Sequence, residues 1–548
     1  MKKISKQISK IFIVIFSMLL IFNVSSVNAK IDENTTANII VTVPVAKEDK
    51  GKTITVYAHK IIEVNTVNGG PANPIFTWSN NIADWVNTNY SAYIDQSNGN
   101  AVTDTFMNLN NTTDKDIIKK FYHELESEIK KGNLTTDSQT VTSDSDMETS
   151  TVTVNFNAMN MGQYLITAKG GVNIYHPTSI AILPIYENDD WITKDANITL
   201  KYEKPSIIKN VANPTDKTVN IGDTVSYVLT PTVPNYPINA LSKKFVVGDN
   251  LSKGLTLNTN SITVYTDTTK NTVMDSKLFS INKTPGITSL NSPYTFEITF
   301  TDDAIKAYAG TQICITYDAL VNKDAIIIDD LKNISYIGYY NDPYEKNSYI
   351  EIPDNENVYT YGIDLKKVDS TDQTKTLAGA EFTLIKQGEQ KPLTFIKRES
   401  SNDYVFDTTT TNTTLAVDNN GLLKIYGLDE GTYILKETKA PIGGYILPSG
   451  DITIKIQETD EKNGILENGE VTITAKGTSE YDDILLENNH IKLNVLNTKG
   501  GDFNLPVTGG TGTILFTLGG LMVMGSAVMV VFRNRKTKDA TRDRKSVV

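Results

Sequence analysis

Three polar residues in the last third of the chain stand where strand alternation directs side chains inward. Lys367 is in phase with Ile363 and Leu365, and Glu437 and Asn497 are likewise in phase with apolar neighbours on their own segments. A neutral lysine amine can attack an asparagine side-chain carbonyl and expel ammonia, while a buried carboxylic acid moves the proton. An isolated inward lysine is more often an edge-strand residue, but three coincident inward groups favour one shared site.

A second set of the same residue types lies in the middle of the chain. Lys209 and Asp249 are in phase with apolar neighbours, and Asn333 opens another strand-like segment. Asp318 and Asn322 are close enough in sequence to compete for the roles of acid and asparagine. The first third of the chain shows no comparable set, so we assign it none.

Bonds of this kind would close long loops. We expect each to join the first strand of a domain to its last, across 130 residues for Lys367 and Asn497 and 124 for Lys209 and Asn333. By the chain-entropy argument used for disulfides, each closure would destabilise the unfolded state by about 5 kcal/mol. Tension would then cross each domain through a covalent bond.

Composition excludes several classes of function. The chain has 548 residues, 52 Lys and Arg and 64 Asp and Glu; without the basic ends, 1–29 and 509–548, the net charge falls from −12 to −21. Such a charge disfavours nucleic acid as a partner. With one Cys and four scattered His, neither a disulfide framework nor a metal site is expected, and no cofactor is expected. Cys314 reads as a small buried hydrophobic residue.

The two ends carry export and anchoring signals. Residues 1–29 combine four Lys, an apolar run and a small-residue cleavage site, which predicts a signal peptide. Near the other end, LPVTGG at 505–510 precedes a mostly apolar stretch at 513–532 and a basic tail, and this stretch is long enough to cross a bilayer. This order resembles the LPXTG cell-wall sorting signal of Gram-positive bacteria. The resemblance implies that a sortase recognises Leu505 and Pro506, cuts between Thr508 and Gly509, and joins Thr508 to an amine.

The body between these ends reads as an all-β protein. Short segments of alternating apolar and polar residues are separated by clusters of Asn, Asp, Gly, Pro and Thr, which predicts β-sandwiches. Residues 113–131 differ, because Ile117, Phe121, Leu125 and Ile129 recur every four positions after a capping box at Thr113. We expect one amphipathic helix packed on the first sandwich.

Proline-containing joints divide the body into three parts. They lie near Pro205 and Pro353 and give domains at 30–203, 204–357 and 358–503, followed by the sorting signal at 504–548.

Several motifs in the third domain are recognisable. They are LAGAEFTL at 377–384, GLxxGTY at 427–433 and YxLxETxAP at 433–441. They resemble the Cna-B-type domain and the E box of Gram-positive backbone pilins, with one extra glycine at Gly443-Gly444 before Tyr445. The resemblance implies three tandem immunoglobulin-like sandwiches, a structural role in which isopeptide formation is the only catalysis, and the two sets above as isopeptide sites, with Glu437 and Asp249 as the catalytic acids.

In this family a lysine near the first joint receives the Thr of the next subunit. Lys204 and Lys201 follow Trp191 but depart from the family motif in spacing and order, so two solvated linker lysines remain an alternative. We rank Lys204 ahead of Lys201. The resemblance implies as partners a pilus-specific and a housekeeping sortase, copies of this chain, minor pilins, peptidoglycan and host surface ligands. The alternative function is a monomeric wall-anchored adhesin, which differs in whether such a lysine accepts another subunit.

Overall fold

The structure is a computed structural model that describes residues 30–111, 115–136, 138–144, 150–188, 190–214, 216–326, 331–399, 401, 403–458 and 464–501. The predicted signal peptide, the sorting residues Leu505, Pro506, Thr508 and Gly509, and the apolar stretch at 513–532 lie outside these residues. Within them, no helix is long and apolar enough to cross a membrane.

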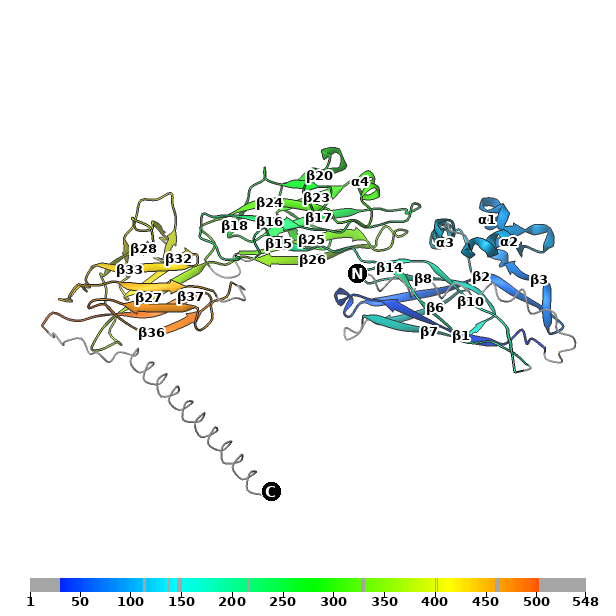
Figure 1. The fold of residues 1–548 in the computed structure, drawn as a ribbon, viewed down its shortest axis with the longest axis horizontal. Coiled ribbons are helices and arrows are strands. Elements are labelled where there is room, and N and C mark those ends of the chain that lie inside the picture. The colour runs from blue at the N-terminus through cyan, green and yellow to red at the C-terminus, as the bar shows by residue number, and fades with distance from the viewer. Residues whose placement is uncertain are drawn as a thin grey trace, which may run out of the picture.

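The chain forms three β-sandwiches that follow one another along the longest axis (Figure 1). Alternating burial along the strands produces them: in β1 every second residue from Ala37 to Val43 is buried, and β27 follows a similar pattern. The core of the third sandwich, built around Tyr361, Phe382 and Tyr433, is a separate cluster of buried side chains. The all-β fold with tandem sandwiches is therefore confirmed.

The first sandwich packs a small sheet against a large one. The small sheet has the order β13-β1-β7 and the large one β10-β8-β2-β3-β5-β4, with β6 beside β2. Strands β9 and β14 pair beside them, next to the second sandwich. The bounds are β1 Thr36–Pro44, β2 Thr53–Val67, β3 Gly70–Trp78, β4 Ile94–Asp95, β5 Ala101–Val102, β6 Ser138–Asp144, β7 Thr151–Asn160, β8 Gly162–Lys169, β9 Ile174–His176, β10 Thr178–Ile182, β13 Ala196–Thr199 and β14 Lys201–Glu203.

Helices α1 (Asn80–Asn89), α2 (Asp104–Met107) and α3 (Lys115–Lys130) cover one side of this sandwich (Figure 1). Helix α3 confirms the predicted helix, and Phe121 and Leu125 are fully buried as expected. Ile117 was placed wrongly: it is 40% exposed, and Ile118 packs on the core in its place. Thr113 lies outside the described residues.

The middle sandwich has two main sheets. Their orders are β15-β16-β24-β18, with β19 beside β24, and β20-β23-β17-β25-β26. The bounds are β15 Lys209–Val211, β16 Thr224–Leu229, β17 Phe245–Leu251, β18 Leu255–Leu257, β19 Thr263–Tyr265, β20 Phe279–Asn282, β21 Gly286–Ile287, β23 Phe296–Phe300, α4 Asp302–Ala307, β24 Cys314–Val321, β25 Lys332–Tyr340 and β26 Tyr349–Asn357.

The third sandwich places its first and last strands side by side. The sheet orders are β29-β30-β32-β27-β37-β36 and β31-β28-β33-β34-β35, and β27 runs parallel to β37. The bounds are β27 Tyr361–Asp369, β28 Glu381–Lys386, β29 Phe395–Lys397, β30 Tyr404–Phe406, β31 Leu415–Ala416, β32 Leu422–Leu428, β33 Gly431–Lys439, β34 Ile452–Ile456, β35 Val471–Ala475, β36 Glu480–Glu487 and β37 His490–Asn497.

Candidate functional site

The structure brings Lys367, Glu437 and Asn497 together inside the third sandwich. Lys367 on β27 and Asn497 on β37 stand on neighbouring parallel strands, and Glu437 reaches them from β33 in the facing sheet. The Lys367 Nζ donates a hydrogen bond to Asn497 Oδ1. Asn497 Nδ2 donates to Glu437 Oε1 at 2.8 Å, and Glu437 Oε2 lies 3.1 Å from Lys367 Nζ. One carboxyl group thus contacts both reacting nitrogens.

Burial sets the electrostatics of this group. Lys367 is fully buried, and desolvation lowers its pKa to about 8, against the pull of Glu437. Desolvation raises the pKa of Glu437 above its usual value. Both shifts favour a neutral amine beside a protonated acid, which is the state that amine attack on an amide requires.

The loop at the end of the E box also contacts this site. Gly443 and Gly444 adopt φ values of +109° and +89°, which residues with a side chain rarely adopt. The loop turns so that Tyr445 donates to Asp369 Oδ2 at 2.7 Å, and the carbonyl of Ile446 accepts from Asn497 Nδ2 at 3.1 Å. The extra glycine therefore fits a turn that holds the asparagine amide in place.

The middle sandwich buries the second set. Lys209 on β15, Asp249 on β17 and Asn333 on β25 have at most 2% of their surface exposed. The Lys209 Nζ contacts Asp249 Oδ2 and also donates to the Tyr317 hydroxyl at 2.8 Å, which accepts from Asn333 Nδ2 at 2.7 Å. Tyr317, on β24, thus bridges the lysine and the asparagine.

Burial again lowers the pKa of Lys209 and raises that of Asp249. Asp249 Oδ1 and Asn333 Oδ1 are buried without a hydrogen-bond partner among the described residues. A proton on Asp249 would turn one of its carboxyl oxygens into a hydrogen-bond donor beside these unpaired acceptors. The site therefore also suits a neutral lysine beside a neutral acid.

Asp318 and Asn322, the competing candidates for the middle site, lie in other surroundings than Asp249 and Asn333. Asp318 accepts from Ser226 Oγ at 2.6 Å and is partly exposed, and Asn322 donates to the carbonyl of Lys253 at 2.8 Å. Neither reaches Lys209. Tyr317 was missed, although its phase with two buried neighbours on β24 marks it as an inward hydroxyl.

One expectation about connectivity is wrong. Asn333 lies on β25, the penultimate strand of the middle sandwich, and β26 follows it at the sheet edge. Asn333 stands opposite Glu356 in the β25–β26 ladder. A bond at Asn333 would therefore leave the hairpin from 333 to 356 outside the covalent connection.

The two joint lysines differ in their surroundings. Lys204 is partly buried and pairs with Glu48 at 2.8 Å, and this pairing contributes to a lowered pKa of Glu48. Lys201 is exposed on β14, opposite His176 of β9. The neighbouring Tyr202 is 47% exposed.

A charged network links α3 to the middle sandwich at this first joint. Lys130 Nζ lies 2.6 Å from Asp342 Oδ2 and 3.1 Å from Glu126 Oε1. His123 contacts the Tyr344 hydroxyl at 3.1 Å. Glu126 is buried, which raises its pKa to about 7. The first two sandwiches are thus held together by buried charges as well as by apolar contacts.

Replacing Lys130 with Met should lower the free energy of unfolding of the first sandwich by about 3–5 kcal/mol, because two buried carboxyl groups lose their cation. All three tryptophans lie in this sandwich, so their fluorescence during urea unfolding reports on it alone. Lys131→Met is the matched control, since Lys131 is more exposed and pairs with the partly exposed Glu128; its effect should stay below about 1 kcal/mol. Equal effects of the two variants would contradict the assigned role.

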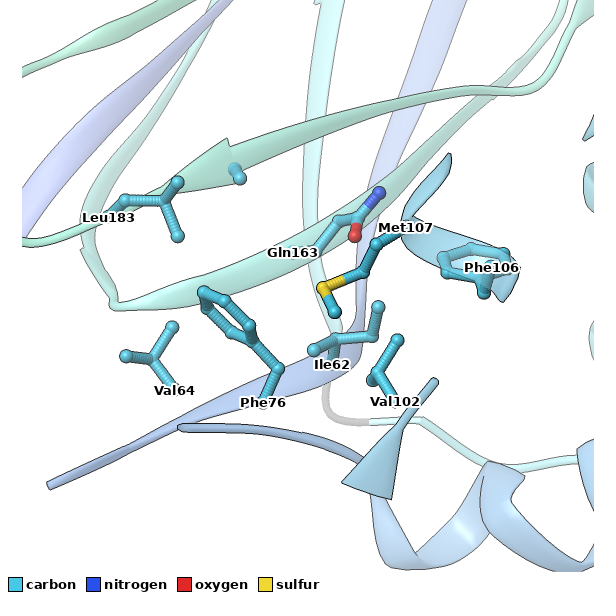
Figure 2. Close-up of a pocket in the computed structure, with 9 residues that line it drawn as sticks. Ile62, Val64, Phe76, Val102, Phe106, Met107, Gln163 and Leu183 are labelled. Carbon is cyan, nitrogen blue, oxygen red and sulfur yellow. The ribbon is translucent and has the colours of Figure 1, made fainter. Parts of the chain in front are cut away.

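The described residues also contain an apolar pocket in the first sandwich, lined by residues such as Ile62, Phe76 and Met107 (Figure 2). It encloses about 40 Å³, and its polar lining residue, Gln163, donates to the Tyr122 hydroxyl at 3.1 Å. The lining contains no group for acid, base or nucleophilic chemistry. Among the described residues no cluster of acids, His or Cys is arranged to hold a metal ion, and Cys314 is buried with a raised pKa.

Three segments of the chain match models of known protein families. Residues 221–343 match the Gram-positive pilin backbone subunit 2, Cna-B-like domain; residues 362–481 match a prealbumin-like fold domain; and residues 497–539 match the LPXTG cell wall anchor motif. Over these residues the chain is therefore similar to the backbone pilins of Gram-positive bacteria and to the LPXTG cell wall anchor motif.

One curated relative is the trypsin-resistant surface T6 protein of Streptococcus pyogenes serotype M6 (strain ATCC BAA-946 / MGAS10394). It is 30% identical over 324 residues, which cover 53% of this chain and 55% of the relative, so the match spans about half of that protein. Together with the anchor motif, this relative supports attachment of the protein to the cell wall as a surface pilus protein.

One solved structure shows a similar fold. The T6 backbone pilin of serotype M6 Streptococcus pyogenes, described as a modular three-domain structure, has a TM-score of 0.51 at 21% identity, covering 86% of this chain and 100% of that one. The full-length major pilin SpaD from Corynebacterium diphtheriae has a TM-score of 0.44 at 17% identity, covering 87% and 100%.

Proposed function

We propose that the protein is the major shaft subunit of a covalent pilus. A sortase joins Thr508 of one copy to Lys204 of the next copy, and Lys201 is the second candidate for this acceptor. Isopeptide bonds Lys367–Asn497 and Lys209–Asn333 stabilise each copy. The observation that carries this proposal is the buried contact of Lys367, Glu437 and Asn497, since such a group would be costly unless it served a reaction.

In the third sandwich, the Lys367 proton first moves to Glu437 Oε2, which leaves a neutral amine and a neutral acid. The Nζ atom attacks the side-chain carbonyl carbon of Asn497 and forms a C–N bond. The protonated Glu437 carboxyl group, whose Oε1 lies 2.8 Å from Asn497 Nδ2, then turns its O–H toward this nitrogen and gives it the proton as the bond from this nitrogen to carbon breaks. Ammonia leaves, an amide remains, and Glu437 collects the proton lost by the lysine nitrogen.

In the middle sandwich Asp249 plays the part of Glu437, and its carboxyl group interacts with both Lys209 and Tyr317. The Tyr317 hydroxyl lies between Lys209 Nζ and Asn333 Nδ2, at 2.8 and 2.7 Å, and can relay the proton to the departing ammonia. Tyr317 is thus the added member of this site.

Assembly requires an amine at the first joint and a cleaved sorting signal. The domain limits 30–203, 204–357 and 358–503 place Lys204 at the start of the middle domain, and the sorting signal follows the third. The proposed partners are a pilus-specific and a housekeeping sortase, further copies of this chain, minor pilins, peptidoglycan and host surface ligands. A monomeric adhesin with the same two ends is the competing function.

Wall extracts boiled in detergent and probed for this chain distinguish the two. Cells with the wild-type chain should give a ladder of multiples, and Lys204→Ala should reduce it to a monomer band, because no amine then accepts Thr508. Lys201→Ala is the matched control and should keep the ladder. Loss in Lys201→Ala alone would reassign the acceptor, and a single band in wild type would discard the shaft in favour of the adhesin.

A further inference from the structure

Exposed apolar side chains gather where the third sandwich ends. Ile442 is 77% exposed, and Ile446 and Leu447 are 38% and 46% exposed. This end patch lies against the last described residues, since the Ile446 amide donates to the carbonyl of Thr498 and Gly500 donates to Gly444. These side chains therefore combine high exposure with a position beside the segment, 498–501, that leads toward the sorting signal.

A second group of exposed apolar side chains lies at the first joint. Ile238 is 77% exposed, Tyr202 is 47% exposed and Leu241 is 45% exposed. We call these residues the joint patch. The loop that carries Ile238 and Leu241 is held against the first sandwich, because Asn235 Nδ2 donates to Glu203 Oε1 at 2.7 Å and Asn239 Nδ2 to the carbonyl of His123 at 3.0 Å.

The length of chain between the third sandwich and Thr508 limits where a linked copy can sit. Thr508 is seven residue steps beyond Gly501, and these steps span at most about 25 Å when fully extended. If Thr508 is bonded to Lys204 of another copy, the end patch must lie within this distance plus a lysine side chain of that residue. Tyr202, in the joint patch, is two residues from Lys204.

We propose that the end patch of one copy docks on the joint patch of the next copy, so that the covalent link is reinforced by a noncovalent contact. This inference rests on the proposed function. The occupant is a second copy of this chain, because the tether keeps the two patches close to each other in every linked pair. Burying apolar side chains from both copies would hold the joint at a fixed angle and present the lysine to the incoming Thr508.

The test places a photoreactive benzoylphenylalanine at position 442 of the full chain in cells that assemble it, followed by irradiation, digestion of the fibres and mass spectrometry. Adducts between position 442 and peptides containing Tyr202 or residues 235–241 are expected. Benzoylphenylalanine at Ile287, which is 69% exposed on β21, is the control and should give no such adducts.

A second experiment introduces a negative charge into the joint patch and measures the fraction of chain in multimers. Ile238→Asp should lower the fraction of chain in multimers at least five-fold, whereas Ile287→Asp should leave it unchanged. A normal ladder with adducts from position 442 only to other proteins, or to other surfaces of this chain, would overturn the docking but leave the shaft intact. Absence of any ladder in wild type would overturn both.

Discussion

Stretched between positions 204 and 501, the mature chain should lengthen by about 75 Å in one step and then resist further extension. The proposed bonds send tension from Lys209 to Asn333 and from Lys367 to Asn497. Asn333 and Glu356 face each other in the ladder, so the force pulls the β25–β26 hairpin apart from its open end. The 23 residue steps from Asn333 to Glu356 supply about 80 Å of chain, less the few ångströms already spanned.

Single-molecule force spectroscopy with handles at these two positions measures the step. In Asn333→Ala, the 148 residue steps from Lys209 to Asn357 should be released instead, which is about 500 Å. Asn497→Ala should add a similar release from the third sandwich. A wild-type chain that gives the long release, or no step at all, would contradict the proposed connections.

The same path of tension explains why the first sandwich needs no isopeptide bond. Tension entering at Lys204 would pass directly to Lys209 without crossing residues 30–203. A domain outside the load path needs no internal bond, in line with the absence of a predicted set there. It would be held to the fibre by the network around Lys130.

Replacing Asn497 with Ala should lower the free energy of unfolding of the third sandwich by about 5 kcal/mol, because the unfolded chain regains the freedom of a 130-residue loop. The lysine then remains an amine. Its pKa in the folded state, about 8, is below the unfolded value of 10.5, so the unfolded state binds more protons between these values. Stability of this variant should therefore rise from pH 8 to 10.5, by up to about 3 kcal/mol.

Urea unfolding at several pH values measures both effects. The wild-type third sandwich should lack the rise from pH 8 to 10.5, because its lysine is consumed in an amide. Lys436→Ala, on the outer face of β33, is the control and should leave stability and its pH dependence as in wild type. A rise of equal size in wild type would mean that Lys367 is still a free amine.

Strand alternation predicted the inward positions well, because period two leaves few choices once a sandwich is assumed. It placed Lys367, Glu437 and Asn497 on buried faces of separate strands, and their contacts followed from the sheet order. It did not find Tyr317, because a buried tyrosine looks like an ordinary core residue until its hydroxyl is seen between Lys209 and Asn333.

The order of the strands in the sheets and the buried faces of the helices were harder to predict from the sequence. Whether β26 follows β25 at the sheet edge depends on nonlocal pairing that no local pattern records. Helix α1 was missed because its sequence is rich in Asn, and it is stabilised by burying Ile82 and Val86 rather than by propensity. In α3, Ile117 lies four residues and Ile118 three residues before Phe121; both spacings suit one helix face, and Ile118 is the one that packs on the core.

The intact mass of the mature chain tests the central claim most directly, because each isopeptide bond removes one ammonia, about 17 Da. The account predicts a mass about 34 Da below that of the sequence, half of which is regained in Asn497→Ala, after allowance for the substitution, and half in Asn333→Ala. An unshifted wild-type mass would show that Lys367 and Lys209 remain amines and would contradict the account.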